Sequence, residues 1–127
     1  MLARYQIVRG HRPEGDPLPE GRRYDTRKHT QHVLRPTPEI VEAFLSDPSP
    51  AGFKRFRAAY VAVLDERFAE QAGRFDALAE EARQGDVFLG CNCPTAHQPD
   101  VRHCHTWLAL EYMARKYPDL DVRLGAR

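Results

Sequence analysis

Residues 87–117 have the sequence VFLGCNCPTAHQPDVRHCHTWLALEYMARKY, whose pattern indicates an α/β fold. Its first four residues form a continuous apolar run, which is typical of a β-strand buried on both faces. An apolar-rich helix then begins near Asp100, a good N-cap residue, and ends at Tyr117, just before a proline. A second, shorter apolar run covers residues 122–124. A strand, a helix and a strand in this order predict two neighbouring parallel strands joined by a crossover helix.

The middle of the chain predicts helices with clear start signals. Thr37 and Ser49 are good N-cap residues, and each is followed by a proline that suits the first helical turn. Apolar residues recur after each of them at three- and four-residue spacing, which is the pattern of a helix with one buried face. We expect Gly73 to break the second helix, and Gly85 to end a third in the left-handed conformation.

The first third of the chain is rich in arginine, proline and glycine. Residues 3–8 predict a strand that ends at Gly10, residues 15–21 an irregular loop and residues 33–34 a short strand. With the later elements, this predicts a small Rossmann-like three-layer α/β domain with a mainly parallel sheet and a helical middle segment. A chain of 127 residues with 42% apolar content is of the size of one domain, so we expect residues 1–127 to form a single domain.

Charge and hydropathy exclude several functional classes. The formal net charge is +1, so no global charge attracts the chain to nucleic acid or to an anionic membrane. No apolar run approaches the roughly 20 residues that span a bilayer, and residues 1–9 lack the apolar run of a signal peptide. We therefore expect a cytoplasmic protein that binds neither membranes nor nucleic acid. Glycine-rich phosphate-binding motifs and the G-x-S-x-G motif of serine esterases are absent.

The three cysteines lie close together in sequence, which suggests a metal site. An odd number of cysteines is a poor disulfide framework for a reducing compartment. Cys91 and Cys93 are two positions apart, so in extended chain their sulfurs leave from the same side. Cys104, near the predicted helix start, and one histidine would complete a tetrahedral site, for which zinc is the favoured metal. Both His97, in the loop, and His105 are candidates for the fourth ligand.

The same residues also allow two other interpretations. Cys104 near a helix N-terminus would have its thiolate stabilised, and either His105 or His103 could accept its proton, which is the arrangement of a catalytic nucleophile. The domain would then be a metal-free thiol-dependent enzyme or ligand-binding domain. In the third interpretation, the cysteines are simply buried and the cluster is purely structural, because cysteine is among the most buried residue types.

Four basic residues are candidates for binding an anion. Arg9, His11 and Arg12 follow a predicted strand, and parallel strands deliver their following loops to the edge that also receives the Cys91 loop. Arg102 lies at the start of the predicted helix, where the helix N-terminus itself favours negative charge. Two interpretations follow: these side chains bind a small anionic ligand, such as a phosphate-bearing or nucleotide-like molecule, above the Cys/His cluster, or they are solvated and distant from it.

The cysteine segment also resembles a known family. The run from Leu89 to Cys93, followed by the pair Cys104 and His105 at a helix start, is similar to the family catalogued as domain of unknown function 488. The family pattern there is Leu-Leu-Cys-x-Glu, a spacer and then Cys-His-Arg, so Cys93 stands where the family has Glu, and Thr106 stands where it has Arg. The helical stretch 36–64 resembles the segment that precedes this motif. The resemblance implies a Rossmann-like α/β fold and no particular reaction.

Overall fold

The computed structural model describes residues 1–125, which form a three-stranded parallel sheet and three α-helices. In chain order the elements are β1 (Leu2–Gln6), β2 (Arg22–Asp25), α1 (Pro38–Ser46), α2 (Pro50–Gln84), β3 (Val87–Cys91), the 3-10 turn η1 (Val101–His103) and α3 (His105–Lys116). The sheet has the order β1-β3-β2, and both outer strands run parallel to β3. The expected α/β class with a parallel sheet is confirmed.

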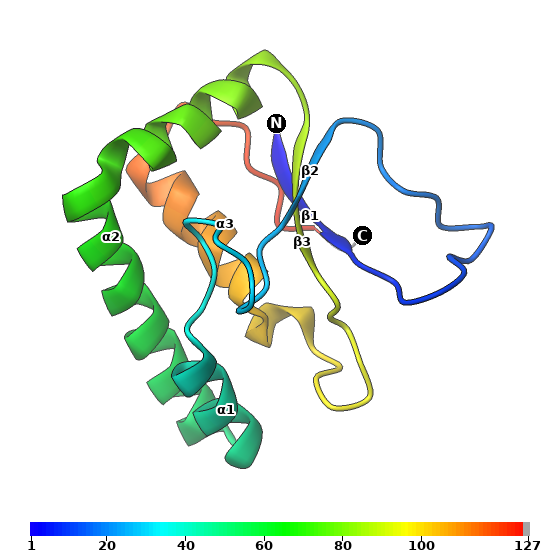
Figure 1. Ribbon diagram of the computed structural model, residues 1–127, viewed down its shortest axis with the longest axis vertical. Coiled ribbons are helices and arrows are strands. Elements are labelled where there is room, and N and C mark those ends of the chain that lie inside the picture. Colours follow the sequence, from blue (N-terminus) through cyan, green and yellow to red (C-terminus); the bar gives the residue numbers. More distant parts are fainter. Residues whose placement is uncertain (126–127) are drawn as a thin grey trace.

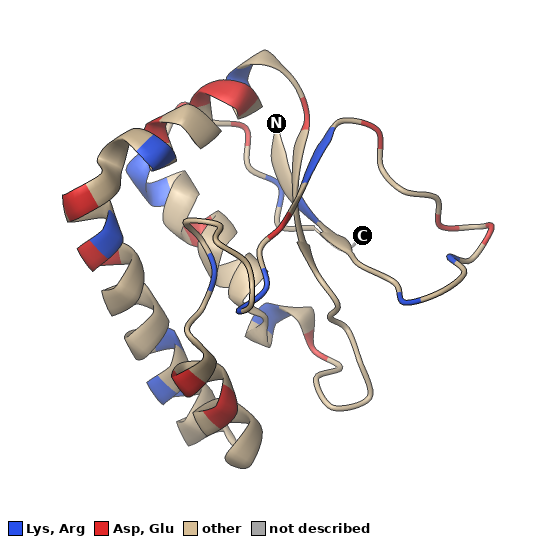
Figure 2. Ribbon diagram, viewed as in Figure 1, with Lys and Arg blue, Asp and Glu red and all other residues tan. Residues whose placement is uncertain are grey.

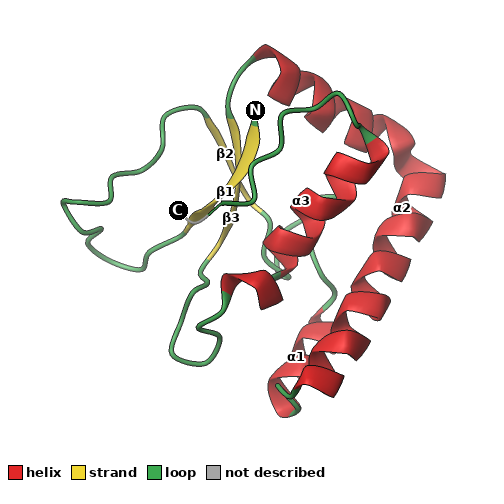
Figure 3. Cartoon of the chain, turned by 180° about the vertical axis from the view of Figure 1, so that it is seen from behind, coloured by secondary structure: helices red, strands yellow, loops and turns green. Residues whose placement is uncertain are grey.

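The helices and the long loop lie on opposite sides of the sheet. Figures 1 and 3 show α1, α2 and α3 together on one side, with α3 close to the strands and α2 packed against α3. The irregular segment 7–21 lies on the other side. The layer on that second face is therefore a loop, where a larger Rossmann-like domain would have further helices.

Strand β3 occupies the centre because both of its faces are apolar. Val87 and Leu89 belong to the core that packs against the helices, whereas Phe88 and Gly90 face the other side. On that side the ring of Tyr5 lies over Gly90, where an added Cβ would come within 2.7 Å of Tyr5 Cε1. Glycine at position 90 therefore allows this close approach, and all five residues of β3 are buried, as the apolar run predicts.

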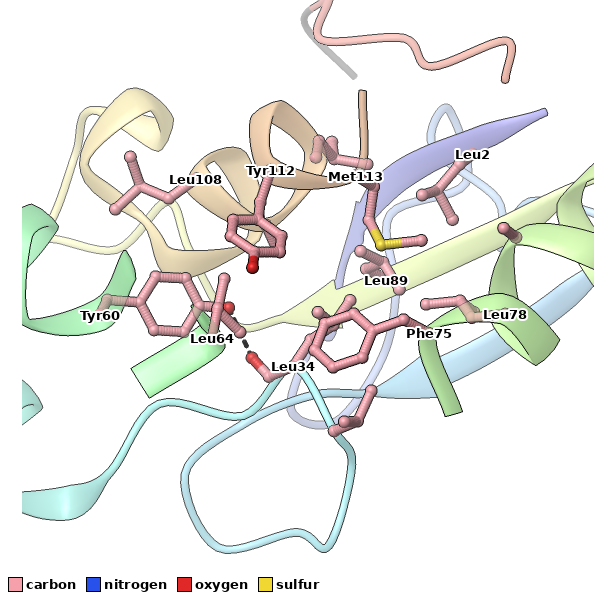
Figure 4. Packing of buried hydrophobic residues seen from close by; sticks show 14 of the residues in the cluster. Leu2, Leu34, Tyr60, Leu64, Phe75, Leu78, Leu89, Leu108, Tyr112 and Met113 are labelled. Carbon is pink, nitrogen blue, oxygen red and sulfur yellow. Dashed lines mark hydrogen bonds between the residues drawn. The ribbon is translucent and has the colours of Figure 1, made fainter. Parts of the chain in front are cut away.

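One apolar core joins the sheet to all three α-helices. Figure 4 shows Leu89 of β3 surrounded by side chains of α2 and α3, among them Phe75 and Met113. Tyr60 is fully buried and donates a hydrogen bond from its hydroxyl to the carbonyl oxygen of Leu34 at 2.6 Å. This bond attaches the turn that contains Leu34 to α2, and the aromatic side chains of α2 that belong to the core are Phe56, Tyr60 and Phe75.

Both predicted helix starts in the middle of the chain are confirmed. The side chain of Thr37 accepts a hydrogen bond from the backbone of Ile40, and that of Ser49 accepts one from the backbone of Gly52. The predicted break near Gly73 is confirmed in part: non-helical angles at Gln71 (φ −136°, ψ 39°) kink α2 two residues earlier, while Gly73 itself is helical and α2 continues to Gln84. One glycine costs a helix only about 1 kcal/mol relative to alanine, which packing of its neighbours can offset. No helix of the described residues is both long enough and apolar enough to cross a membrane.

Three other local predictions need correction. Gly85 ends α2 in an extended conformation (φ −170°), so the left-handed cap is wrong. Residues 33–34 form a buried turn and no strand. Val122 forms its parallel bridge with Leu2 of β1, so the last apolar run is separated from β3 by β1. The chain pairs Val122 with the exposed edge of β1 because β2 already occupies the other edge of β3.

Candidate metal centre

Three cysteine sulfurs meet at the carboxyl end of β3. Cys91 is the last residue of β3, Cys93 follows it in the loop, and Cys104 is the N-cap residue of α3. The three Sγ atoms lie within 4.8 Å of one another, and Cys91 Sγ lies 3.8 Å from Cys93 Sγ. The side chains are 5%, 6% and 1% exposed, and they form an apolar cluster separate from the main core. The predicted convergence of the three sulfurs is confirmed.

The loop between Cys93 and Cys104 is held by its own hydrogen bonds. Thr95 and Gln98 exchange two backbone hydrogen bonds, which close a tight turn. The side-chain amide of Gln98 donates to Cys93 Sγ at 3.2 Å and to the carbonyl oxygen of His103 at 3.3 Å. Asp100 then accepts from the backbone of Arg102 and caps η1, so the α-helix begins later than predicted, at His105. The turn and η1 together bring Cys104 back to Cys93.

His105 faces the sulfurs with one ring nitrogen and a threonine with the other. Nδ1 lies 3.9 Å from Cys104 Sγ, and Nε2 lies 2.9 Å from Thr26 Oγ1. The Thr26 hydroxyl also lies 3.0 Å from the carbonyl oxygen of Gly90, which can only accept, so the hydroxyl must donate there. Nε2 therefore carries the hydrogen that Thr26 accepts, and in the neutral ring the lone pair of Nδ1 points toward Cys104.

Arg4 of β1 is buried beside the cysteines. Its side chain is on the helix-facing side of the sheet, and the residue is only 2% exposed. Nε donates to Thr106 Oγ1 at 3.0 Å, and Thr106 in turn donates to Cys104 Sγ at 3.1 Å. Nη2 donates to the carbonyl oxygen of Cys93 at 2.7 Å. The guanidinium thus contacts both sides of the Cys93–Cys104 loop.

The charged states of the cluster are strongly linked. Hydrogen bonds from Cys91 and Cys93 hold the pKa of the Cys104 thiol well below its ordinary value. The hydrogen bond between Cys93 and Cys104 raises the pKa of Cys93 to about 12. Hydrogen bonds with Cys104 and Cys93 likewise raise the pKa of Cys91. Burial alone would lower the pKa of His105, but the neighbouring Cys104 thiolate more than offsets it and raises this pKa to about 10. Negative charge therefore concentrates on Cys104, next to His105.

The segment 91–105 contains three histidines, and two of them, His97 and His103, lie outside the cysteine cluster. His97 is exposed and points away from the three converging sulfurs, so the structure does not bring it to the cluster. The turn at 95–98 points it outward because Gln98 occupies the inner side of the loop. The ring of His103 packs against that of Phe53, with ring centroids 4.3 Å apart. His105 is the histidine that adjoins the sulfurs.

The predicted anion-binding residues are not gathered at the cluster. Arg12 binds the backbone of Gln6 and both the backbone and the carboxylate of Asp16, and Arg102 forms an ion pair with Asp100. Arg9 and His11 are exposed on segment 7–21, whose charged residues Figure 2 shows on the side of the sheet away from the helices. Within residues 1–125, no hydrogen bond joins Arg9, His11 or Arg12 to the 91–105 segment. The anionic ligand remains a prediction.

Sequence reasoning missed four residues that surround the sulfurs: Arg4, Thr26, Gln98 and Thr106. Strand alternation was a usable signal for Arg4, because it shares a face with the buried Leu2. Thr26 follows β2, whose sequence Arg-Arg-Tyr-Asp has no apolar run. Gln98 and Thr106 carried no local signal, since their roles depend on how the loop turns.

Comparisons with known proteins gave no relative. No protein-family model matches the chain, and no curated protein and no solved structure shows a significant match. The resemblance to domain of unknown function 488 therefore stays a prediction, and the site must be interpreted from its own geometry.

Proposed function

We propose that this chain is a zinc-binding α/β domain in which Cys91, Cys93, Cys104 and His105 hold one zinc ion in a closed structural site. The observation that carries the proposal is the convergence of three buried sulfurs on a space bordered by His105 Nδ1. Three thiolates and one imidazole are a common donor set of structural zinc sites.

The distances support this coordination. In a tetrahedral site with bonds of about 2.3 Å to sulfur and about 2.0 Å to nitrogen, neighbouring ligand atoms lie about 3.5 to 3.8 Å apart. Cys91 Sγ and Cys93 Sγ are separated by 3.8 Å, and Cys104 Sγ and His105 Nδ1 by 3.9 Å. The three sulfurs lie within 4.8 Å of one another, and His105 Nδ1 adjoins the sulfur of Cys104, so the four ligand atoms border one site.

The surroundings of the ligands support the same assignment. Metal-binding histidines usually donate their second ring N–H to an outer partner, which fixes the ring and its tautomer. Thr26 is such a partner for His105. Cys93 and Cys104 also accept hydrogen bonds from Gln98 and Thr106, and donors of this kind stabilise thiolate charge.

The burial of the site favours a structural role over a catalytic one. A catalytic zinc keeps one position for water or substrate, whereas four protein ligands close the coordination sphere. The four residues are each at most 6% exposed. The zinc ion would join the end of β3 to the start of α3 and would take the place of an apolar core for residues 92–103, which contain only one short 3-10 turn.

Metal analysis of ligand variants tests this proposal. Protein purified without a histidine tag should contain about one zinc per chain by elemental analysis. Cys91→Ser, Cys93→Ser, Cys104→Ser and His105→Ala should each lose most of it, because three ligands bind zinc more weakly than four. His97→Ala and His103→Ala are matched controls in the same segment and should keep it. Metal-free wild-type protein, or equal loss in His97→Ala and His105→Ala, would contradict the proposal.

A metal-free thiol function is the second candidate, favoured by the lowered pKa of Cys104 and the raised pKa of His105. A thiolate beside an imidazolium is the arrangement of an activated cysteine nucleophile. The sulfur is only 1% exposed, so substrate access would require the 92–103 loop to open. Rapid alkylation of Cys104 alone by iodoacetamide in folded, metal-free protein would support this candidate, and slow alkylation of all three cysteines would contradict it.

A further inference from the structure

Arg4 is a buried cation with no carboxylate partner. In the described part of the chain, no Asp or Glu side chain forms an ion pair with it, although ten other pairs are present on the molecule, such as Arg12 with Asp16. The Arg4 residue is 2% exposed, and one nitrogen of its guanidinium, Nη1, is buried without a hydrogen-bond partner among the described residues. Burying a charge in this way is costly unless an opposite charge lies close by.

The cysteine cluster is the group that can supply this opposite charge. Arg4 reaches it by two routes, through Thr106 to Cys104 Sγ and directly to the carbonyl oxygen of Cys93. Three neutral thiols and a neutral imidazole would leave the guanidinium charge uncompensated. A zinc ion held by three thiolates and a neutral histidine carries a net charge of −1, since the +2 of the metal is added to −3. With Arg4 the buried assembly is neutral.

We propose that Arg4 is the built-in counterion of the zinc site and thereby a determinant of its metal affinity. This inference rests on the proposed zinc site and adds a residue from a strand about ninety positions earlier in the sequence, which supplies no ligand atom. Arg4 acts as a positioning and charge-balancing residue. Its positive charge stabilises the thiolate form of the cluster, and with it the metal-bound state, while its hydrogen bonds keep the two ends of the loop together.

Two substitutions of Arg4 distinguish a role of its charge from a role of its hydrogen bonds alone. Arg4→Met removes the charge and keeps much of the apolar stem, whereas Arg4→Lys keeps the charge and loses the fork of the guanidinium. If charge balance is what matters, lysine should restore most of the zinc affinity that methionine loses. If Arg4 only bridges Thr106 and Cys93, both variants should lose affinity to a similar extent, because methionine donates no hydrogen bond and the single nitrogen of lysine lacks the fork by which Nε and Nη2 reach the two acceptors.

The matched control is Arg57→Met. Arg57 is an exposed arginine of α2 for which the described residues provide no ion pair, so its substitution changes the net charge of the chain by the same amount away from the site. Zinc affinity of all variants can be measured by competition of zinc ion alone with a chromophoric chelator. Loss of an outer partner typically weakens a metal site by about 10- to 100-fold.

We expect Arg4→Met to bind zinc about 10- to 100-fold more weakly than wild type, while Arg4→Lys and Arg57→Met stay within about threefold. If Arg4→Met does not fold, Arg4→Lys decides alone: affinity within threefold supports the inference, and a larger loss overturns it. If the wild-type protein binds zinc and Arg4→Met binds it with unchanged affinity, or Arg4→Lys binds it as weakly as Arg4→Met, the proposed role of Arg4 is wrong. The proposed zinc site is then unaffected. Wild-type protein that binds no zinc overturns the proposed function itself.

Discussion

Thr26 Oγ1 lies 2.9 Å from Nε2 of His105, and the same hydroxyl donates to the carbonyl oxygen of Gly90. This pair connects the segment after β2 to the first residue of α3, across β3. It sets the orientation of the imidazole and leaves Nδ1 facing Cys104. Thr26 directly follows β2, a strand that the sequence analysis did not predict. The position of β2 therefore orients the histidine on which the proposed site depends.

Replacing Thr26 by valine should weaken zinc binding about 10- to 100-fold, because valine keeps the shape of threonine but cannot accept the hydrogen from Nε2. Competition with a chromophoric chelator measures the effect. Thr26→Ser keeps the hydroxyl and is the control, with an affinity expected to stay close to wild type. An unchanged affinity in Thr26→Val would show that this hydrogen bond does not orient the ligand.

Removing the metal should destabilise the wild-type protein and leave a ligand variant unaffected. A ligand present at 1,000 times its dissociation constant stabilises the folded state by about 4 kcal/mol. Thermal melts with excess zinc and with a chelator should therefore differ clearly for wild type. Cys104→Ala should show nearly the same midpoint in both conditions, because it has lost one of the converging sulfurs. Equal midpoints for wild type would argue that no metal contributes to folding.

His32 makes a separate prediction about pH. Burial lowers its pKa to about 4, and its Nδ1 accepts a hydrogen bond from the backbone of Leu34 at 3.1 Å. In the unfolded chain His32 binds a proton near pH 6.5, whereas in the folded chain it binds one only near pH 4. The free energy of unfolding therefore falls as the pH is lowered from about 6.5 toward 4, by up to about 3 kcal/mol.

Urea unfolding of His32→Asn tests this at several pH values. The asparagine oxygen can replace Nδ1 as the acceptor for Leu34, but it does not titrate. The free energy of unfolding of this variant should fall less steeply than that of wild type between pH 6.5 and 4, and should match it more closely at pH 7. Parallel curves for the two proteins would exclude His32 as a source of the pH dependence.

The sequence predicted those parts of the fold that rest on local patterns. The apolar run of β3, the caps at Thr37 and Ser49 and the convergence of three cysteines follow from strand burial, side-chain capping and the geometry of a strand followed by a helix. Each of these signals lies within a few residues of the feature that it predicts.

The rest depends on contacts between distant segments. β2 is a polar edge strand whose Arg22 and Tyr24 are satisfied by Glu81 of α2, which no local pattern reveals. Val122 pairs with β1 because the other edge of β3 is taken. His105 rather than His97 faces the sulfurs because Thr26 and Gln98 fix the ring and the loop from outside the motif.

X-ray absorption at the zinc edge, on untagged protein, identifies the atoms bound to the metal. A Cys91, Cys93, Cys104 and His105 site predicts about three sulfur neighbours near 2.3 Å and one nitrogen neighbour near 2.0 Å from a single zinc. A coordination shell without three sulfurs, or purified protein that contains no zinc while all three thiols remain free, would contradict the proposed zinc site.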